Sequence, residues 1–358
     1  MSRWSAFGGV LAVWAALLVV LLPSLFPRRG PEPAEASTAS GAHERVVSIS
    51  WAGDITLGSS FGLPPEQGRS LFTHVRRRLR TSDLTLGNLE GALSESAGSK
   101  CAAASEGCFS FHAPPQNAAS LRWAGFDLMN LGNNHAFDAG AGGQEQTVEA
   151  LRRARLRHVG RPGQITVVRR RGLRIATVGL APYPWSTDLR DLAAVQALVA
   201  RASARADLVV VMAHLGAEGD QQSHTPKGRE IHMGEDRGDT RAFAHAAIDA
   251  GADLVLGSGP HVLRGIEFHG GKLIAYSLGN LAGWHNFSTS GTYALSGVLT
   301  VRLSAEGHLR GGRFTPLRLN AAGVPSPDPT GEATAVVSKL GHQDFGFTGL
   351  RLRRDGSF

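Results

Sequence analysis

From Val46 onward, the chain alternates short apolar runs with amphipathic stretches, and this alternation constrains its fold more than any other feature. Runs rich in β-branched residues predict strands, whereas apolar residues spaced three and four apart predict helices. The predicted strands are 46–53, 84–91, 127–135, 173–181, 207–216 and 253–261, and the predicted helices are 115–125, 143–156, 192–206 and 239–252. This order is typical of an α/β domain built on parallel strands.

The pattern changes in the last quarter of the chain. Two β-rich segments fold back at glycine-containing turns, 266–280 at a His-Gly-Gly turn and 297–319 at an Ala-Glu-Gly-His turn. Short turns between apolar arms predict antiparallel hairpins. A short helix is predicted at 331–340. The chain is therefore expected to open with parallel strands and to close with antiparallel ones.

Composition narrows the class of protein. Hydrophobic residues make up 42% and charged residues 19% of the 358 residues, which is typical of a folded domain, and two cysteines are too few for a four-cysteine zinc module. The formal net charge is +7, and all but four of the 37 basic residues are arginines. Because arginine binds carboxylates and phosphates in a bidentate fork, one interpretation is an anionic partner, and the other is an arginine-rich solvated surface. No nucleic-acid motif is present, so nucleic acid is not predicted as a partner.

The N-terminus carries a predicted membrane-targeting segment. Residues 6–26 contain no charge, and about 20 apolar residues are enough to cross a bilayer as a helix. The run is longer than the apolar centre of a cleaved signal peptide, and the nearest small-x-small site, 34–36, lies well beyond it. Residues 1–27 are therefore predicted to be a signal anchor, with a cleaved signal peptide as the alternative. Residues 28–45 are typical of a flexible linker, and the folded domain is expected at 46–358.

The predicted location is the cell envelope. We expect an inner-membrane anchor with the domain outside the cytoplasm, or a secreted or periplasmic protein if the segment is cleaved. Six residues separate Cys101 from Cys108. In an oxidising compartment these two thiols are expected to form a disulfide across a small surface loop. Two unpaired thiols in a variable insertion are the alternative.

Polar residues with metal-binding side chains follow the predicted strands. They are Asp54, Asn88, Glu90, Asn133, Asn134, His135, His214, Glu218 and His261. In open α/β sheets, ligands bind outside the carboxyl ends of the strands, so these side chains are expected to form one rim. Carboxylate, imidazole and amide groups are ligands for zinc, manganese, iron and magnesium. The sequence therefore predicts a divalent-metal site.

Six short motifs occur in the chain order GDITLG, GNLEG, NLGNNHAFDAG, AHLGAEG, GPHVLRG and YSLGN. Together they resemble the CapA family of capsule and poly-γ-glutamate synthesis proteins, which belongs to the calcineurin-like metallophosphoesterase superfamily. The resemblance runs from Val46 to Asn280. It implies an α/β fold of the calcineurin-like four-layer sandwich type, in which two mixed β-sheets are flanked by helices and hold a metal centre at the sheet edge.

The resemblance also implies roles for individual residues. The implied metal ligands are Asp54, Glu90, Asn134, His214 and His261. One or two divalent ions (manganese, zinc, iron or magnesium) would support hydrolysis, and His135 would protonate the leaving group. Asn88, Glu218 and Asn280 are expected to contact the substrate or to orient the ligands.

Two positions depart from the pattern of the superfamily. Thr56 stands where a histidine usually follows the first aspartate, and Gly259 stands where the last loop usually has the first histidine of a His-x-His pair. Four polar residues of the insertion 224–239 are candidates to replace a missing ligand: His224, Glu230, His232 and Glu235. A single-metal site, or a site without metal, is therefore an alternative to a two-metal centre.

These features support three functional hypotheses. The first is a membrane-anchored or exported, metal-dependent hydrolase in surface-polymer synthesis, acting on a phosphoester or a related anionic envelope substrate. The second is a non-catalytic component that binds an anionic surface polymer, with capsule-synthesis proteins in the membrane as partners. The third is an exported binding protein whose metal centre has been lost.

Overall fold

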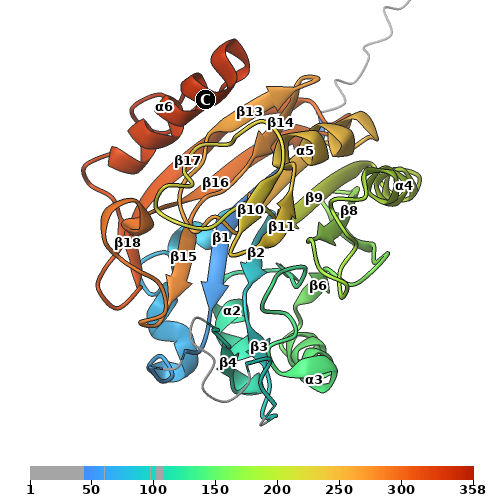
Figure 1. Cartoon of the computed structure of the whole chain (residues 1–358). Helices are drawn as coiled ribbons and strands as arrows, with labels where there is room; N and C mark the ends of the chain where they lie inside the picture. Colours follow the sequence, from blue (N-terminus) through green and yellow to red (C-terminus); the bar gives the residue numbers. More distant parts are fainter. Residues whose placement is uncertain (1–43, 60, 97, 102–107) are drawn as a thin grey trace, which may run out of the picture. The chain divides into compact units, whose positions relative to one another are not determined.

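Two mixed β-sheets pack face to face at the centre of the molecule, and helices cover their outer faces (Figure 1). The computed structural model describes residues 44–59, 61–96, 98–101 and 108–358. The predicted anchor at 1–27 lies outside these residues, as does the predicted linker up to residue 43. Within the part of the chain that is described, no helix is long and apolar enough to cross a membrane.

The first sheet contains eight strands. Its order is β18-β17-β16-β1-β2-β5-β6, and β15 pairs with the last residues of β1. The strands are β1 (Val46–Thr56), β2 (Leu84–Leu89), β5 (Leu128–Asn130), β6 (Arg157–Val159), β15 (Asn280–Gly283), β16 (Leu295–Ser304), β17 (Leu309–Leu319) and β18 (Pro325–Pro327). β1, β2, β5 and β6 run parallel, whereas β16, β17 and β18 form antiparallel pairs.

The second sheet contains six strands in the order β13-β14-β12-β9-β8-β7. They are β7 (Thr166–Arg170), β8 (Leu173–Leu180), β9 (Leu208–His214), β12 (Leu254–Ser258), β13 (Ile266–His269) and β14 (Lys272–Ala275). β8, β9, β12 and β14 run parallel, and the two edge strands are antiparallel to their neighbours. The structure thus confirms the predicted opening with parallel strands and both predicted hairpins, β13–β14 and β16–β17.

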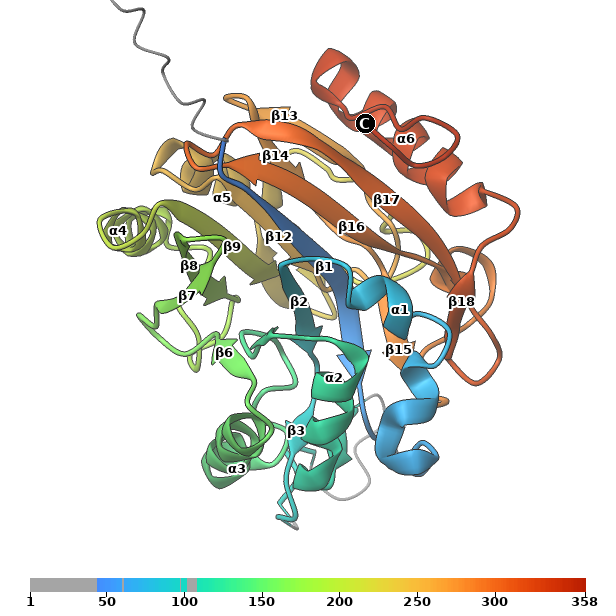
Figure 2. The same ribbon diagram turned by 180° about the vertical axis from the view of Figure 1, so that it is seen from behind.

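Helices form separate layers on the two sheets. The first sheet is covered by the 3-10 helix η1 (Glu66–Phe72), α1 (Arg76–Leu79), α2 (Ala118–Ala124) and α3 (Gly140–Arg153), and the second by α4 (Leu192–Ser203) and α5 (Thr240–Asp249). Figure 2 shows α1 and α2 in front of the first sheet. The last helix, α6 (Glu332–Phe345), contributes Ala333 and Val337 to the core between the sheets.

Short elements complete the chain. They are β3 (Ala92–Leu93) with β4 (His112–Ala113), β10 (Glu230–His232) with β11 (Glu235–Gly238), and the 3-10 turns η2 (Pro115–Asn117), η3 (Gly291–Ala294) and η4 (Gly346–Thr348). The β10–β11 hairpin is built from the polar insertion, for which the sequence predicted no regular structure.

Strand β9 shows why the central strands are apolar throughout. Successive side chains of a strand point to opposite faces. Leu208 and Val210 therefore enter the core between the sheets, while Val209 and Val211 pack under α4 and α5. A strand buried on both faces forms an uninterrupted apolar run, and this run predicts the strand from the sequence.

Several strand boundaries differ by a few residues from the prediction, and two of these differences affect the site. β1 continues to Thr56, because its last residues still pair with β2 and β15, so Asp54 lies within the strand and not after it. The predicted strand 127–135 ends at Asn130. The side chain of Asn130 accepts a hydrogen bond from the Gly132 N–H and donates one to the Gly132 carbonyl, which turns the chain early.

Candidate metal centre

The centre of the site consists of Asp54, Glu90 and His261, which come from three different segments of the chain. Asp54 lies in β1, Glu90 follows β2 and His261 follows β12. Their ligand atoms all lie within 4.8 Å of one another. His261 Nδ1 is 3.4 Å from Asp54 Oδ2, and His261 Nε2 is 3.6 Å from Glu90 Oε1. The two sheets thus bring one carboxylate pair and one imidazole to a common point.

His214 closes this group from the end of β9. Its Nδ1 lies 3.9 Å from Asp54 Oδ1, and its Nε2 lies 3.9 Å from Glu90 Oε1. The ring is completely buried, and this burial lowers the pKa of His214 to about 3. The imidazole is therefore neutral at physiological pH, which is the form that binds metal ions.

Glu218 and Asn134 lie on the outer side of the group. Glu218 Oε2 is 3.5 Å from His261 Nε2, and Asn134 Nδ2 donates to Glu218 Oε1 over 3.3 Å. Arg237 from β11 pairs with the same oxygen at 2.8 Å. Burial opposes the ionised form of Glu218, but the hydrogen bond from His261 and the charges of His261 and Arg237 outweigh it and lower the pKa of Glu218. The sequence did not predict Arg237, although it lies in the insertion that was expected to reach the site.

His135 occupies the opposite side of Glu90. Its Nε2 is 4.0 Å from Glu90 Oε1, and its Nδ1 is 2.7 Å from Asp138 Oδ2. The ring of Phe111 stacks on the imidazole at a centroid distance of 4.2 Å. Burial lowers the pKa of His135, although Asp138 raises it. Asp138 thus orients the ring, as a residue that holds the loop.

Buried asparagines form a hydrogen-bond network that fixes the side chain of Asp54. Asn88 Nδ2 donates to Asp54 Oδ1 over 2.8 Å, and Asn88 Oδ1 accepts from the side chains of Asn130 and Asn133. Because all these groups are buried, the network leaves Asp54 little rotational freedom. Asn88 was predicted, whereas the role of Asn130 becomes visible only when β2 and β5 lie side by side.

The loop after β12 explains why one usual histidine is absent. Gly259 has φ +115°, and its N–H donates to Asp54 Oδ2 over 3.1 Å. A Cβ atom at this position would lie 2.8 Å from the Leu215 carbonyl oxygen. This backbone therefore excludes a histidine at 259, and the main-chain N–H forms a hydrogen bond to Asp54.

His261 is held in an uncommon conformation. Its φ is +61°, in the left-handed region that non-glycine residues rarely adopt. Its Nδ1 donates to Asn280 Oδ1 over 2.8 Å, and Asn280 Nδ2 donates back to the His261 carbonyl. This pairing directs Nε2 toward Glu90 and Glu218, which is how a metal-binding imidazole is usually oriented.

The remaining departures are also accounted for. Thr56 Oγ1 accepts a hydrogen bond from Asn286 Nδ2 over 2.7 Å. The four candidates of the insertion contact other partners or the edge of the site: Glu230 pairs with Arg264, His224 with Asp344, His232 with Glu218 and Glu235 with Arg237. The insertion therefore supports Glu218 and places no side chain beside Asp54 or Glu90.

The donor atoms of this group fit a divalent cation. Both carboxylate oxygens of Glu90, Nε2 of His214 and Oδ1 of Asn134 are buried and have no hydrogen-bond partner among the described residues. Burial raises the pKa of Glu90 well above its usual value. Burying polar atoms without a hydrogen-bond partner lowers the stability of the fold unless an ion or a ligand binds them. Carboxylate, imidazole and amide oxygen are the ligand set of manganese, iron, zinc and magnesium.

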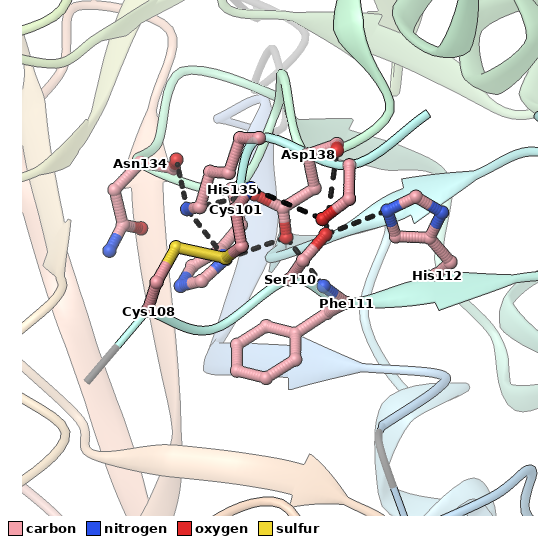
Figure 3. Close-up of a disulfide and its surroundings, with 10 residues drawn as sticks. Cys101, Cys108, Ser110, Phe111, His112, Asn134, His135 and Asp138 are labelled. Carbon is pink, nitrogen blue, oxygen red and sulfur yellow. Dashed lines mark hydrogen bonds and ion pairs between the residues drawn. A yellow bond between two sulfur atoms is a disulfide. The ribbon is translucent and has the colours of Figure 1, made fainter. Parts of the chain in front are cut away.

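A pocket of about 230 Å³ opens above these residues. It is lined by Phe109, Phe111, His135, Glu218, His261, Asn280, Asn286, Phe287, Ser288 and Tyr293. Cys101 and Cys108 form the predicted disulfide beside it (Figure 3). All nine predicted site residues are thus linked by direct contacts into one cluster.

Comparison with known protein families gives one match over most of the domain. The sequence model described as "Bacterial capsule synthesis protein PGA_cap" matches residues 48–283. This span contains every predicted site residue, from Asp54 to Asn280.

Two Bacillus proteins are similar to the chain. The PGA biosynthesis protein CapA of Bacillus subtilis (strain 168) is 29% identical over 273 residues, which cover 70% of this chain and 68% of that protein. The capsule biosynthesis protein CapA of Bacillus anthracis is 31% identical over 237 residues, which cover 60% and 54%. The chain thus matches between roughly half and two thirds of the length of these relatives.

Among solved structures, the chain is similar to the crystal structure of a 5'-nucleotidase precursor from Thermus thermophilus. The TM-score is 0.43 and the sequence identity is 17%, and the alignment covers 82% of this chain and 58% of that chain.

Proposed function

The chain belongs to the family of bacterial capsule synthesis proteins described as PGA_cap, and on that basis we propose that it is a metal-dependent hydrolase in the synthesis of an anionic surface polymer. One observation carries the hydrolase part of the proposal. Glu90 and His214 direct buried ligand atoms, which have no hydrogen-bond partner among the described residues, toward the same group as Asp54 and His261. The two-sheet core with donors at the strand ends supports a calcineurin-like scaffold.

Five residues would hold the cation: Asp54, Glu90, Asn134, His214 and His261. When bound, a divalent ion supplies Lewis-acid polarisation of the bond to be cleaved and neutralises developing negative charge. Among these ligands, Asp54 is held in its metal-binding form before any ion binds. Burial alone would raise the pKa of Asp54, but the nearby imidazole of His261 and the N–H of Gly259 lower it, so this carboxylate is ionised.

His135 is proposed to donate a proton to the leaving group. Asp138 accepts a hydrogen bond from Nδ1, which turns Nε2 toward Glu90 and the pocket. The carboxylate also stabilises the protonated ring, from which Nε2 can donate to a leaving oxygen. The substrate class that suits this arrangement is a phosphoester or a related anionic linkage of an envelope polymer.

We also propose that the domain acts outside the cytoplasm. The apolar segment 6–26 supports an anchor or a signal peptide at 1–27, and residues 28–45 suit a flexible tether. The disulfide between Cys101 and Cys108 suits an oxidising compartment. An anchored domain of this kind would work beside capsule-synthesis partners in the inner membrane, whereas cleavage would release it to the periplasm or the medium.

The experiment that tests the proposal measures bound metal and turnover in the full-length protein. Wild type is compared with His214→Ala, and His224→Ala serves as control because His224 pairs with Asp344 away from the cluster. We expect wild type and control to retain manganese or zinc and to hydrolyse bis(p-nitrophenyl) phosphate, and His214→Ala to lose both. Equal metal content in all three proteins would show that the ligand assignment is wrong.

A second candidate function, polymer binding without hydrolysis, is favoured by a separate observation. A hollow of about 560 Å³ lies at the amino ends of β5 and β6, away from the metal centre. Its lining includes Arg155, Arg157 and Arg169, and none of these has a carboxylate within 4.0 Å among the residues described. Guanidinium groups without a counter-ion suit a polycarboxylate chain.

This second function is tested by the binding of labelled poly-γ-glutamate. The triple substitution Arg155→Gln, Arg157→Gln and Arg169→Gln is compared with Arg351→Gln, Arg353→Gln and Arg354→Gln, which remove the same charge elsewhere. Polymer retention that is lost only in the first triple variant, in a protein without turnover, would support binding over hydrolysis. Equal loss in both would indicate attraction by net charge alone.

A further inference from the structure

Two short segments that the disulfide joins both contact the loop of His135 (Figure 3). They are residues 98–101 and 108–111, which we call the disulfide-linked segments. From the first, the Lys100 N–H donates to the Asp138 carbonyl over 2.9 Å. From the second, the Phe111 N–H donates to Asp138 Oδ2 over 2.6 Å. Both ends of the cross-link therefore bind the residue that orients His135.

Lys100 contributes a charge to this arrangement. Its Nζ lies 2.8 Å from Asp138 Oδ1, 3.1 Å from the Asn134 carbonyl and 3.2 Å from His135 Nδ1. Asp138 is completely buried, so its carboxylate depends on these partners. Lys100 thereby ties together the carboxylate that orients His135 and the backbone of the proposed ligand Asn134.

The aromatic ring of Phe111 packs against the imidazole of His135. Its ring lies over the His135 imidazole at 4.2 Å between centroids and 29° between planes. Asp138 Oδ2, which accepts the Phe111 N–H, also faces His135 Nδ1 at 2.7 Å. The imidazole is thus fixed at its edge by Asp138 and on its face by Phe111, and only 6% of the residue is exposed. Neither partner belongs to the proposed metal ligands.

We propose that the Cys101–Cys108 disulfide is a redox-dependent positioning device for His135, in which Lys100 and Phe111 are the positioning residues. The cross-link spans a sequence separation of 7 and keeps the two Cα atoms 5.7 Å apart, so the two segments move as one. Reduction by dithiothreitol transfers two electrons and two protons to the disulfide, giving two thiols and the cyclic disulfide of the reagent. The segments then separate more freely, and His135 loses its fixed orientation toward Glu90.

The catalytic meaning of this device rests on the proposed function, but the position of His135 can be measured without turnover. The probe is diethyl pyrocarbonate, which modifies accessible neutral imidazoles, with modification followed by peptide mass spectrometry on the full-length protein. We expect reduction to accelerate the modification of His135 by roughly two- to tenfold. Losing an aromatic stacking contact raises the population of accessible imidazole by about this factor. His224, whose side chain is 59% exposed, serves as internal reference.

Three variants separate positioning from general loosening. The double variant Cys101→Ser and Cys108→Ser should show the fast rate with or without reductant. Lys100→Met should show it in the oxidised protein, and Lys100→Arg should restore protection, because a guanidinium can pair with the same carboxylate. Metal content should stay unchanged in all of them, whereas kcat on bis(p-nitrophenyl) phosphate should fall, with KM unaltered, in the double variant and in Lys100→Met but not in Lys100→Arg.

The outcomes distinguish this inference from the proposed function. An unchanged His135 rate after reduction and in the double variant overturns the positioning device, whatever the turnover. A faster His135 rate in a protein without any turnover supports the device and refutes the hydrolase. Loss of metal in the double variant Cys101→Ser and Cys108→Ser, measured without reductant, would also overturn the inference, because the cross-link would then act on the ligands and not on His135.

Discussion

Replacing Glu90 by glutamine should stabilise the metal-free protein while removing its metal site. The carboxylate of Glu90 is completely buried, and neither oxygen has a hydrogen-bond partner among the described residues. A buried polar group in this state costs about 1–3 kcal/mol, and more when it is charged. We therefore expect Glu90→Gln to raise the free energy of unfolding by about 1–3 kcal/mol at pH 8 in EDTA, which corresponds to roughly 2–5 °C in Tm.

The gain should depend on pH with a defined sign. Burial raises the pKa of Glu90 in the folded state, so the unfolded carboxyl group ionises first as the pH increases. Wild type therefore loses stability from about pH 4 upward, whereas the glutamine variant does not. The difference in Tm between the two proteins should be close to zero at pH 4 and largest at pH 8.

Metal should reverse the order of stability. At a free manganese concentration of about 100 times Kd, wild type gains about 2.7 kcal/mol, and the variant gains little. Scanning calorimetry with EDTA and with manganese measures both effects, and Glu95→Gln, at an exposed position, is the matched control. A Glu90→Gln protein that is less stable than wild type in EDTA would refute the reasoning, because Glu90 would then have a stabilising partner.

Three further predictions follow from neighbouring contacts. Gly259→Ala should lower stability by at least about 1–2 kcal/mol, the cost of a left-handed conformation, and should weaken metal binding, as measured by thermal unfolding and metal titration. Arg237→Met should cost about 1–3 kcal/mol because it removes the guanidinium that pairs with Glu218. Since the pKa of Glu218 is lowered in the folded state, this loss of stability should be largest above about pH 5 and should shrink on acidification, as measured by denaturant titrations. Metal affinity should increase from pH 5.5 to pH 8, because Glu90 must lose a proton whose pKa burial has raised, and calorimetry in two buffers should detect proton release.

The sequence was sufficient to predict that the site residues meet. Asp54, Glu90, His214 and His261 each stand at or near the carboxyl end of an apolar run, and parallel strands bring such ends to one sheet edge. The same reasoning predicted β1, β2, β5, β8, β9 and β12 with helices α2 to α5 between them, because these strands are apolar runs, but it did not predict β6 or β7. These features depend on local periodicity, which is visible in a single chain.

Other features depend on contacts between distant segments and could not be predicted. Arg237 reaches Glu218 only because the insertion folds into the β10–β11 hairpin, and no periodic pattern marks that hairpin. Asn130 supports Asn88 because β2 and β5 are neighbours. The hydrogen bond from the Gly259 N–H to Asp54 requires a positive φ, which glycine permits but does not specify.

The energetics of the cluster bear on whether the scaffold has lost its metal. Glu90 and His214 place unpartnered polar atoms in the interior, where each lowers the stability of the metal-free protein. Apolar residues of similar volume at these positions would stabilise a domain that only bound polymer through its surface. His261 adds the cost of a left-handed backbone, which a structural residue at that position would not need. A chain that carries all of these costs at one point, with the donor atoms converging, is better explained by a cation that satisfies them than by a retired centre.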